Sequence, residues 1–418
     1  MVRKGLDCLC NFASEMRKHL LFILLILCFV SMANAFQPHH RGQLSPQAKV
    51  SMLTASPGPE LYTVFGHSAL WVHDPANGID EVYNWGTFDF NTPNFYPLFI
   101  QGRLLYMLTV TSLNSFLYSY MIDGRSVHEQ VLNLTAAEKQ DIYDFLQINR
   151  QPENIHYYYD FFFDNCATRV RDLVDMHLDI DWGPDPHPYE ERSFRQMLKP
   201  YVQHIPWISF GIDLLLGLPS DKIATPWHYM FLPDEMAIAF QQARHGDGRM
   251  LVSGYNELLP LTFETARSFP VTPTMVFWAL WALGVLSLLK PRAARIFDKV
   301  YFTVLGLAGL MLFYLWFVSD HHATAQNLSL LWALPTHLYF IYRASVLSAN
   351  NKTYGPGGSL VKRLPVIYFR MVFVAGVLLL ILWPLNPQGF HPAFFPIIAL
   401  MTLMASKYAW RWFWVPKA

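Results

Sequence analysis

Apolar residues gather at the two ends of the chain, with a more polar stretch between them. Near the N-terminus, an apolar run at residues 20–32 follows a basic stretch at 17–19 and ends in Ala33-Asn34-Ala35. A basic flank, a short apolar core and a small-residue site are typical of a secretory signal peptide. We therefore predict a cleaved signal peptide at residues 1–35, with an uncleaved anchor helix as the alternative.

Five apolar segments follow near the C-terminus, each close to the roughly 20 residues that a membrane-spanning helix needs. They lie at about 273–289, 301–319, 328–345, 366–385 and 391–409. The connections between them alternate between several Lys or Arg residues and none. Because basic loops favour the cytoplasmic side, this alternation predicts a five-helix transmembrane domain at 269–418 whose C-terminus is cytoplasmic. The chain would then be a multi-pass protein of the inner membrane, and the domain that precedes the five helices would lie in the periplasm.

Residues 36–268 alternate short apolar runs with polar residues and turns, which is typical of a soluble domain. Runs at 65–72 and 82–86 flank a turn that contains Asn-Gly, so they predict a hairpin. Segments 103–114 and 125–134 are further strand or short-helix candidates, and the aromatic run 157–163 resembles a strand.

Two helices are also predicted in this region. Thr135 and Glu138 form a capping box that begins a helix ending near Asn149. Apolar residues at helical spacing after position 169 predict another helix that begins near Asp164 or Asn165. We therefore expect an α+β domain, with its core at about 45–180, followed by an all-α membrane domain.

Composition narrows the function classes. Hydrophobic residues make up 53% of the 418-residue chain and charged residues 15%, against about 25% charged in a typical soluble domain. This composition argues against a disordered or wholly soluble chain. The 31 basic and 31 acidic residues balance, so there is no basic excess of the kind that nucleic-acid binding requires.

Cys166 is the cysteine that stands apart. Three of the four cysteines lie within the first 28 residues, so cleavage of the signal peptide would leave Cys166 as the single thiol. Its predicted place in the first turn of a helix offers free N–H groups and a helix dipole that stabilise a thiolate. A buried, unreactive cysteine is the alternative interpretation.

His67, in the first strand of the predicted hairpin, is the candidate base for this thiol. Asn84 on the partner strand could orient the His67 ring, provided that the register places Ala69 opposite Asn84. Other candidates for this third group are Asp80, Glu81 and Asp89. The backbone N–H of Cys166 and the Asn165 amide are candidate oxyanion donors.

The sequence contains neither C-x-x-C nor H-E-x-x-H, so we expect no metal site and no cofactor. Asp320-His321-His322 lies at the periplasmic end of the predicted second span. Such a polar cluster at a membrane edge either binds a head group or substrate, or forms a solvated loop.

Several motifs together resemble a known family. These are Phe65-Gly66-His67-Ser68-Ala69-Leu70, the run from Tyr83 to Phe90, Asp164-Asn165-Cys166-Ala167-Thr168-Arg169, Phe231-Leu232-Pro233-Asp234, and Asp320-His321 followed by Asn327 and Leu331-Trp332. The chain resembles bacterial membrane proteins with an Lnb-type N-terminal periplasmic domain. The resemblance covers nearly the whole chain, and it implies a circularly permuted relative of the papain-like NlpC/P60 fold.

The same resemblance implies a lipoprotein N-acyltransferase. Cys166 would be the nucleophile, His67 the base and Asn84 a third catalytic residue, with Asp164 and Asn165 supporting the helix start. Further contacts to substrate or head group would come from Arg169, Asp320, His321 and Asn327.

An acyl chain would pass from a phospholipid, through a Cys166 thioester, to the N-terminal amine of a diacylated lipoprotein or to another amine. Two other functions are alternatives, the first with the same Cys–His pair and the second with a thiol that is merely buried. One is an NlpC/P60-like thiol peptidase acting on cell-wall peptides, and the other is a non-enzymatic membrane assembly or binding module.

Overall fold

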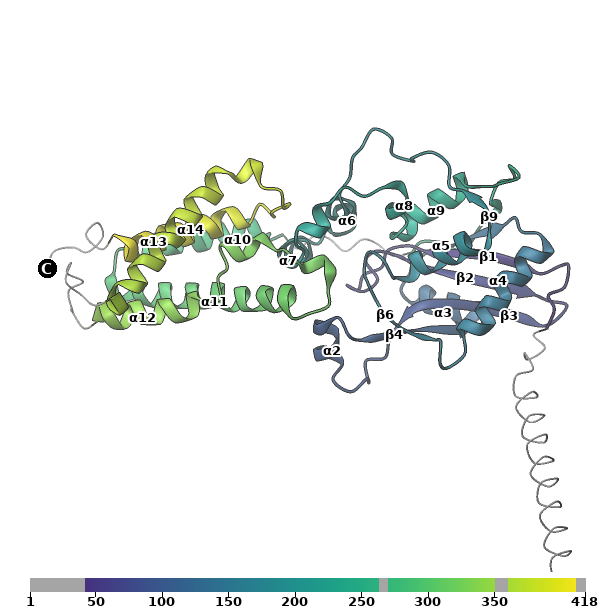
Figure 1. Cartoon of the computed structure of the whole chain (residues 1–418), viewed down its shortest axis with the longest axis horizontal. Helices are drawn as coiled ribbons and strands as arrows, with labels where there is room; N and C mark the ends of the chain where they lie inside the picture. The colour runs from purple at the N-terminus through teal and green to yellow at the C-terminus, as the bar shows by residue number, and fades with distance from the viewer. Residues whose placement is uncertain (1–41, 263–269, 350–359, 411–418) are drawn as a thin grey trace, which may run out of the picture. The chain divides into compact units, whose positions relative to one another are not determined.

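The computed structural model describes residues 42–262, 270–349 and 360–410 (Figure 1). The predicted signal peptide lies outside these residues. The described chain is an α+β domain followed by a helical domain, which agrees with the predicted fold class.

A seven-stranded antiparallel sheet forms the centre of the first domain, in the order β6-β4-β3-β2-β1-β5-β9. The strands are β1 (Lys49–Ala55), β2 (His67–Asp74), β3 (Ile79–Thr87), β4 (Leu105–Thr111), β5 (Val127–Leu132), β6 (His156–Tyr158) and β9 (Val252–Leu259). A separate pair joins β7 (Ile180–Asp181) and β8 (Arg244–His245). The strand β9 pairs with β5, so the sheet extends well beyond the core that was predicted to end at about residue 180.

The first domain also contains several short helices. They are α2 (Phe95–Gln101), α3 (Leu113–Ile122), α4 (Ala136–Asn149), α5 (Cys166–His177), α6 (Phe194–Val202), α7 (Pro206–Leu215), α8 (Pro226–Tyr229) and α9 (Pro233–Gln242), with a 3-10 turn η1 (Leu218–Asp221). The helix α5 packs against β2 and β3, and α9 packs against β1. The N-terminus of α5 is thereby held beside the start of β2.

Most of the predicted elements of this domain are confirmed. The hairpin is β2–β3, the segments 103–114 and 125–134 contain β4 and β5, and Thr135 and Glu138 form the capping box of α4. The aromatic run is a strand only as far as Tyr158. Beyond it, the Asp160 carboxylate accepts the backbone N–H groups of Phe162 and Phe163, which turns the chain toward α5.

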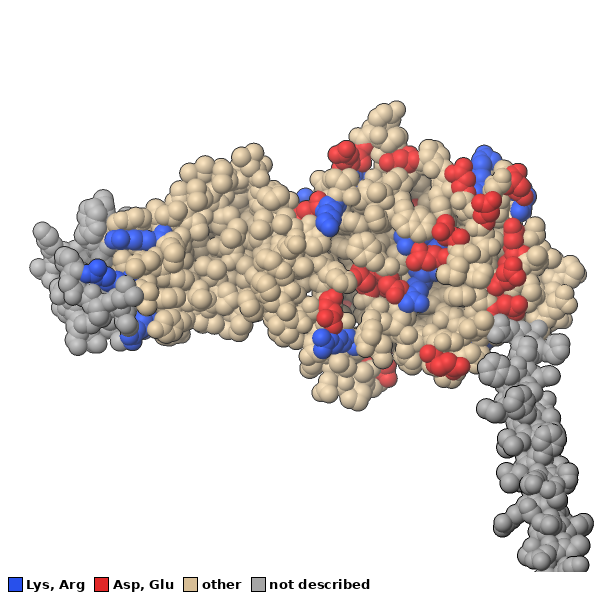
Figure 2. Space-filling view, in the orientation of Figure 1, with Lys and Arg blue, Asp and Glu red and all other residues tan. Residues whose placement is uncertain are grey.

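The described part of the second domain contains five helices: α10 (Pro273–Ser287), α11 (Pro291–Phe317), α12 (His337–Ala349), α13 (Leu360–Ile381) and α14 (Phe394–Ala409). Of these, α11 and residues 363–381 of α13 are long and apolar enough to cross a membrane on length and hydropathy alone, whereas α10 and α14 are shorter apolar helices. Charged side chains gather over the first domain, while the visible face over α10–α14 is nearly free of them except at one end (Figure 2).

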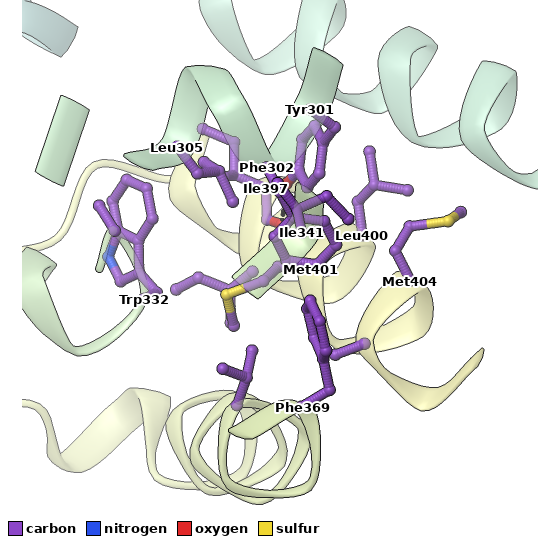
Figure 3. Packing of buried hydrophobic residues seen from close by; sticks show 14 of the residues in the cluster. Tyr301, Phe302, Leu305, Trp332, Ile341, Phe369, Ile397, Leu400, Met401 and Met404 are labelled. Atoms are coloured by element: carbon purple, nitrogen blue, oxygen red, sulfur yellow. Dashed lines mark hydrogen bonds between the residues drawn. The ribbon is translucent and has the colours of Figure 1, made fainter. Parts of the chain in front are cut away.

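Aromatic and branched side chains from four of these helices, with Trp332 from the loop before α12, fill the interior of the second domain (Figure 3).

The predicted third span, 328–345, is wrong at its start. A 3-10 turn, η3 (Leu328–Leu331), precedes α12, which begins only after Pro335. The helix α11 begins earlier than the predicted second span at 301–319. Its first turns at 291–300 are amphipathic, so a hydropathy criterion does not detect them. Further 3-10 turns are η2 (His322–Thr324) and η4 (Trp383–Leu385).

A buried polar network joins the segment after α7 to two loops of the helical domain. Arg195, which is 2% exposed, pairs with Asp213 and Asp221. The backbone N–H of Gly389 donates to Asp221, and the Asn327 amide donates to backbone carbonyls of residues 214 and 215. These contacts attach the loops before α12 and α14 to the first domain.

Gly309 of α11 allows a close approach of two backbone segments in the helical domain. A Cβ atom on Gly309 would lie 2.0 Å from the carbonyl oxygen of Ala333. Small residues allow such approaches between membrane helices, and overpacking costs about 1–3 kcal/mol or more where backbone must move. We expect Gly309→Ala to lower the midpoint of thermal unfolding in detergent by several degrees.

The matched control is Gly211→Ala in α7, where a Cβ meets nothing within 4 Å. Alanine is the better helix former, so this variant should unfold at or above the wild-type temperature. Equal midpoints for the two variants would contradict the packing that we describe at Gly309.

Candidate active site

Cys166 and His67 lie together because α5 packs against β2 and each residue is the first of its element. Cys166 is the first residue of α5 and His67 is the first residue of β2. A methyl group placed on Gly86 would lie 3.6 Å from Cys166 Cβ and 4.0 Å from His67 Cε1. Both side chains are half-buried, so they remain within reach of a substrate.

Asn84 holds the imidazole ring of His67. Its Oδ1 lies 2.5 Å from His67 Nε2. The register pairs Leu70 with Tyr83, and one further step places Asn84 opposite Ala69, which is the register that this role requires. With Nε2 bound to Asn84, Nδ1 is the ring nitrogen that remains for the thiol.

The three alternative partners for His67 lie elsewhere. Asp80 accepts hydrogen bonds from the Trp71 indole and the backbone of Leu113. Glu81 pairs with Arg150, and Asp89 caps the turn at Asn91. Each of these carboxylates has its own local function, and among the described residues the Asn84 amide is what orients the His67 ring.

The surroundings favour a thiolate–imidazolium pair. Burial alone raises the pKa of Cys166, but the positive charge and hydrogen bond of His67, together with the backbone N–H groups of Ser68 and Ala167, lower this pKa overall. Burial likewise disfavours a charged His67, yet the neighbouring thiolate and the Asn84 amide raise its pKa. The two groups titrate as a pair, and the shift of each pKa favours the charged form of that group.

Asn165 fixes the start of α5. Its Oδ1 accepts the backbone N–H groups of Ala167 and Thr168, both at 2.9 Å, and its Nδ2 donates to the carbonyl oxygens of Phe161 and Phe231. Both amide protons are therefore engaged, so the expected use of the Asn165 amide as an oxyanion donor does not fit the structure. The backbone N–H of Cys166 itself has no acceptor among the described residues and remains a suitable donor.

Tyr157 and Gly86 also belong to the site, although the sequence patterns did not predict either as a site residue. The buried Tyr157 hydroxyl has no partner of hydrogen-bonding geometry among the described residues, and it faces the methyl position of Gly86 at 4.0 Å. Gly86 has φ +89°, a conformation that favours glycine and leaves open the space between Tyr157 and Cys166. Only the pairing of β4 with β6 brings Tyr157 here, so a local sequence motif could not reveal it.

Asp164 and Arg169 support this arrangement from one side. Arg169 forms a two-point ion pair with Asp164, and its guanidinium lies 3.9 Å from the centre of the Tyr157 ring. Both residues line a surface groove of about 290 Å³ that neither Cys166 nor His67 lines. The contacts of Arg169 therefore hold Tyr157 beside the thiol.

The predicted contacts in the helical domain lie apart from the thiol. Asp320 pairs with Arg103 at 2.7 Å, and His321 Nε2 lies 2.8 Å from the carbonyl oxygen of Phe99. Asn327 is 1% exposed and its amide is fully bonded, so it holds a loop in place and does not present a group to a ligand, contrary to expectation. His322 instead reaches Asp160, in the turn that precedes Cys166, at 3.0 Å.

The fold and the site define a class of protein: a domain with a Cys–His–Asn arrangement, joined to a bundle of apolar helices. Two family models match the chain, the Lnb N-terminal periplasmic domain at residues 35–188 and the Lnb transmembrane domain at residues 264–413. The chain therefore belongs to the Lnb-type membrane proteins, a family of membrane enzymes that modify lipoproteins. No curated protein and no solved structure gives a match.

The Cys166–His67 pair predicts a characteristic pH dependence. Since the pKa of Cys166 is lowered, its alkylation by neutral iodoacetamide should reach half its maximal rate below the pH of an ordinary thiol. His67→Ala removes the positive charge, so the midpoint of alkylation should move to higher pH. For a thiol that titrates above neutral pH, a midpoint one pH unit higher lowers the thiolate fraction at neutral pH about tenfold.

His156→Ala is the control, because His156 is exposed in β6. It should leave the midpoint of alkylation unchanged. A wild-type midpoint at the ordinary thiol value, unaffected by His67→Ala, would argue against the ion pair.

Proposed function

We propose that the protein is a thiol acyltransferase that moves an acyl chain from a phospholipid to the N-terminal amine of a diacylated lipoprotein. The observation that carries this proposal is the polarised Cys166–His67 pair in a domain that is joined to membrane helices. Family membership supports it, since Lnb-type proteins act on lipoproteins in membranes.

In the first half-reaction, the Cys166 thiolate attacks the carbonyl carbon of a phospholipid ester and a C–S bond forms. The carbonyl oxygen becomes an oxyanion, for which the backbone N–H of Cys166 and the Tyr157 hydroxyl are the proposed donors. The C–O bond then breaks, and the departing lysophospholipid oxygen takes the proton from the His67 imidazolium. A thioester on Cys166 and a neutral His67 remain.

In the second half-reaction, the neutral amine of the acceptor attacks the thioester carbonyl. His67 takes a proton from the attacking nitrogen while the Cys166 thiolate leaves, which restores the ion pair. The products are an amide and a lysophospholipid, so the bonds and protons balance without any further reactant.

The proposed orientation follows from the distribution of charges in the sequence. The α+β domain would lie in the periplasm, the five helices in the inner membrane and the C-terminus in the cytoplasm. Both proposed substrates are held in that membrane by acyl chains, which accounts for the attachment of the thiol domain to it.

A labelling experiment tests the reaction. Purified protein in mixed lipid–detergent micelles is given phospholipid with a labelled acyl chain. We expect a hydroxylamine-labile label on wild-type protein, which moves to an added diacylated lipopeptide. Cys166→Ala should abolish the label, and His67→Ala should lower its rate of appearance by at least 100-fold.

His156→Ala serves again as the control and should label normally. If the wild type takes no label although Cys166 is readily alkylated, the acyltransferase proposal fails, and cleavage of cell-wall peptides becomes the reaction to assay. Label that cannot be transferred to the lipopeptide would exclude the lipoprotein as acceptor.

Tyr157 provides a separate test of the oxyanion arrangement. Tyr157→Phe removes only the hydroxyl, and loss of one oxyanion donor typically lowers kcat by about 10²–10³. We expect thioester formation to slow by this factor, with little change in KM for the phospholipid and with normal alkylation of Cys166.

Tyr158→Phe, an exposed neighbour in the same strand, is the matched control. It should retain the wild-type rate of thioester formation. Wild-type kcat in Tyr157→Phe would remove this hydroxyl from the mechanism.

A further inference from the structure

The segment that contains α2 is uncharged and apolar. From Phe90 to Gly102 the sequence contains no Asp, Glu, Lys or Arg. Four large apolar side chains of this segment face outward, with exposed fractions of 47–71%: Phe90, Tyr96, Phe99 and Ile100. We call these four residues the α2 patch. In a domain that is otherwise rich in surface charge, such a patch marks a surface that contacts something apolar.

Two hydrogen bonds, one between backbones and one from the His321 side chain, attach α2 to the segment that follows α11. The backbone N–H of Asp320 donates to the carbonyl oxygen of Gln101 at 2.8 Å, and His321 Nε2 lies at the same distance from the carbonyl oxygen of Phe99. A Cβ atom on Gly102, which ends α2 with φ +73°, would lie 3.2 Å from the backbone of Asp320. The two segments are therefore in backbone contact.

These contacts set the depth of α2 relative to a bilayer. The outward-facing side chains at the end of α11 are apolar as far as Phe317 and Val318, which are 57% and 50% exposed. Asp320 follows two residues later, which is at most about 7 Å of chain. The polar zone on each side of the hydrocarbon core is of similar thickness, roughly 5–8 Å. A segment bonded to residues 320 and 321 consequently lies at the level of the lipid head groups.

A row of aromatic rings connects the α2 patch with the thiol site. Phe99 stacks with Phe95 at 6.3 Å, and Phe95 contacts Phe88 at 5.8 Å. Phe88 in turn contacts Tyr106, whose ring lies 4.4 Å from that of Tyr159. Tyr159 is half-buried. Two residues before it, Tyr157 lies at the thiol site, where a methyl group placed on Gly86 would be 4.0 Å from the Tyr157 hydroxyl and 3.6 Å from Cys166 Cβ. One end of this row is therefore at the membrane and the other is two residues from the thiol site.

We propose that the α2 patch inserts into the adjacent leaflet of the membrane and is the surface along which a phospholipid acyl chain leaves the bilayer for Cys166. The occupant is a lipid surface, because the patch is uncharged and is bonded to the segment that follows a membrane helix. The statement about the acyl chain rests on the proposed acyltransferase function, whereas the statement about insertion does not.

Insertion is tested with a full-length chain whose own cysteines are replaced. A polarity-sensitive fluorophore is attached at Tyr96→Cys, and the protein is reconstituted into phosphatidylcholine vesicles that contain acyl-chain-brominated lipid. We expect bromine to quench the fluorophore by at least half. The control is the same label at Tyr189→Cys, which is 98% exposed on another loop and should not be quenched.

Equal quenching at the two positions, or none at position 96, would overturn the proposal. Energy transfer between labels at position 96 on different molecules, without quenching by brominated lipid, would also overturn it and would indicate a contact between two copies of the chain. None of these readouts depends on acyl transfer.

The route to Cys166 is tested with the double variant Phe99→Glu and Ile100→Glu. Acyl labelling from bilayer phospholipid should fall at least tenfold, while alkylation of Cys166 by a water-soluble reagent stays at the wild-type rate. Tyr189→Glu is the control and should label normally. Undiminished labelling of the double variant would overturn the route, and absence of labelling in the wild type would count against the proposed function alone.

Discussion

The site depends on one buried side chain, the amide of Asn165. It is 3% exposed and forms four hydrogen bonds, two that cap α5 and two to the carbonyl oxygens of Phe161 and Phe231. Phe231 lies just before α9, which packs against β1, so the start of α5 is tied to an element that is distant in the sequence. Because Cys166 is the next residue, this amide sets the position of the thiol relative to β2. A buried amide that is fully bonded specifies one geometry, since any shift would leave polar groups unpaired.

Local patterns in the sequence predict the parts of the site that arise from nearest neighbours. The Asn-Gly turn predicts the β2–β3 hairpin, and alternation within it places Asn84 on the face of His67 once the register is set. Capping chemistry predicts that Cys166 begins a helix. Three other features depend on contacts between distant segments. They are the position of the Tyr157 hydroxyl at the site, the hydrogen bonds that occupy both protons of the Asn165 amide, and the attachment of α2 to residues 320 and 321. The late start of α12 is a local effect of Pro335. A hydropathy criterion does not detect it, because the residues before α12 are also largely apolar.

The two domains are joined by polar groups as well as by apolar contacts of α7, whose Phe210 packs against Phe277 and Phe394. Arg195 is almost fully buried, yet two carboxylates and the backbone carbonyl of Leu216 satisfy it. Such a network contributes little net stability compared with apolar packing, but it strongly disfavours displacement, because removing one partner leaves a charge buried alone. The contact of His322 with Asp160 adds a second attachment, directly at the turn before Cys166. Polar contacts at both points therefore attach the first domain to loops of the helical domain.

A thiolate near a lipid surface faces two opposing requirements. The nucleophile has to be charged, whereas an acyl chain and the membrane edge favour an environment with few charges and little water. The structure meets both by pairing each charge with its opposite. The Cys166 thiol lies beside the His67 ring, where the charged form of each group stabilises that of the other, and Arg169 lies beside Asp164 and Arg103 beside Asp320 at the end of α2. Each pair is neutral as a unit, so the cost of desolvation on contact with lipid is far smaller than for an isolated ion. Under the proposed function, the aromatic row between α2 and Tyr159 can therefore remain apolar along its length while it ends near a charged nucleophile.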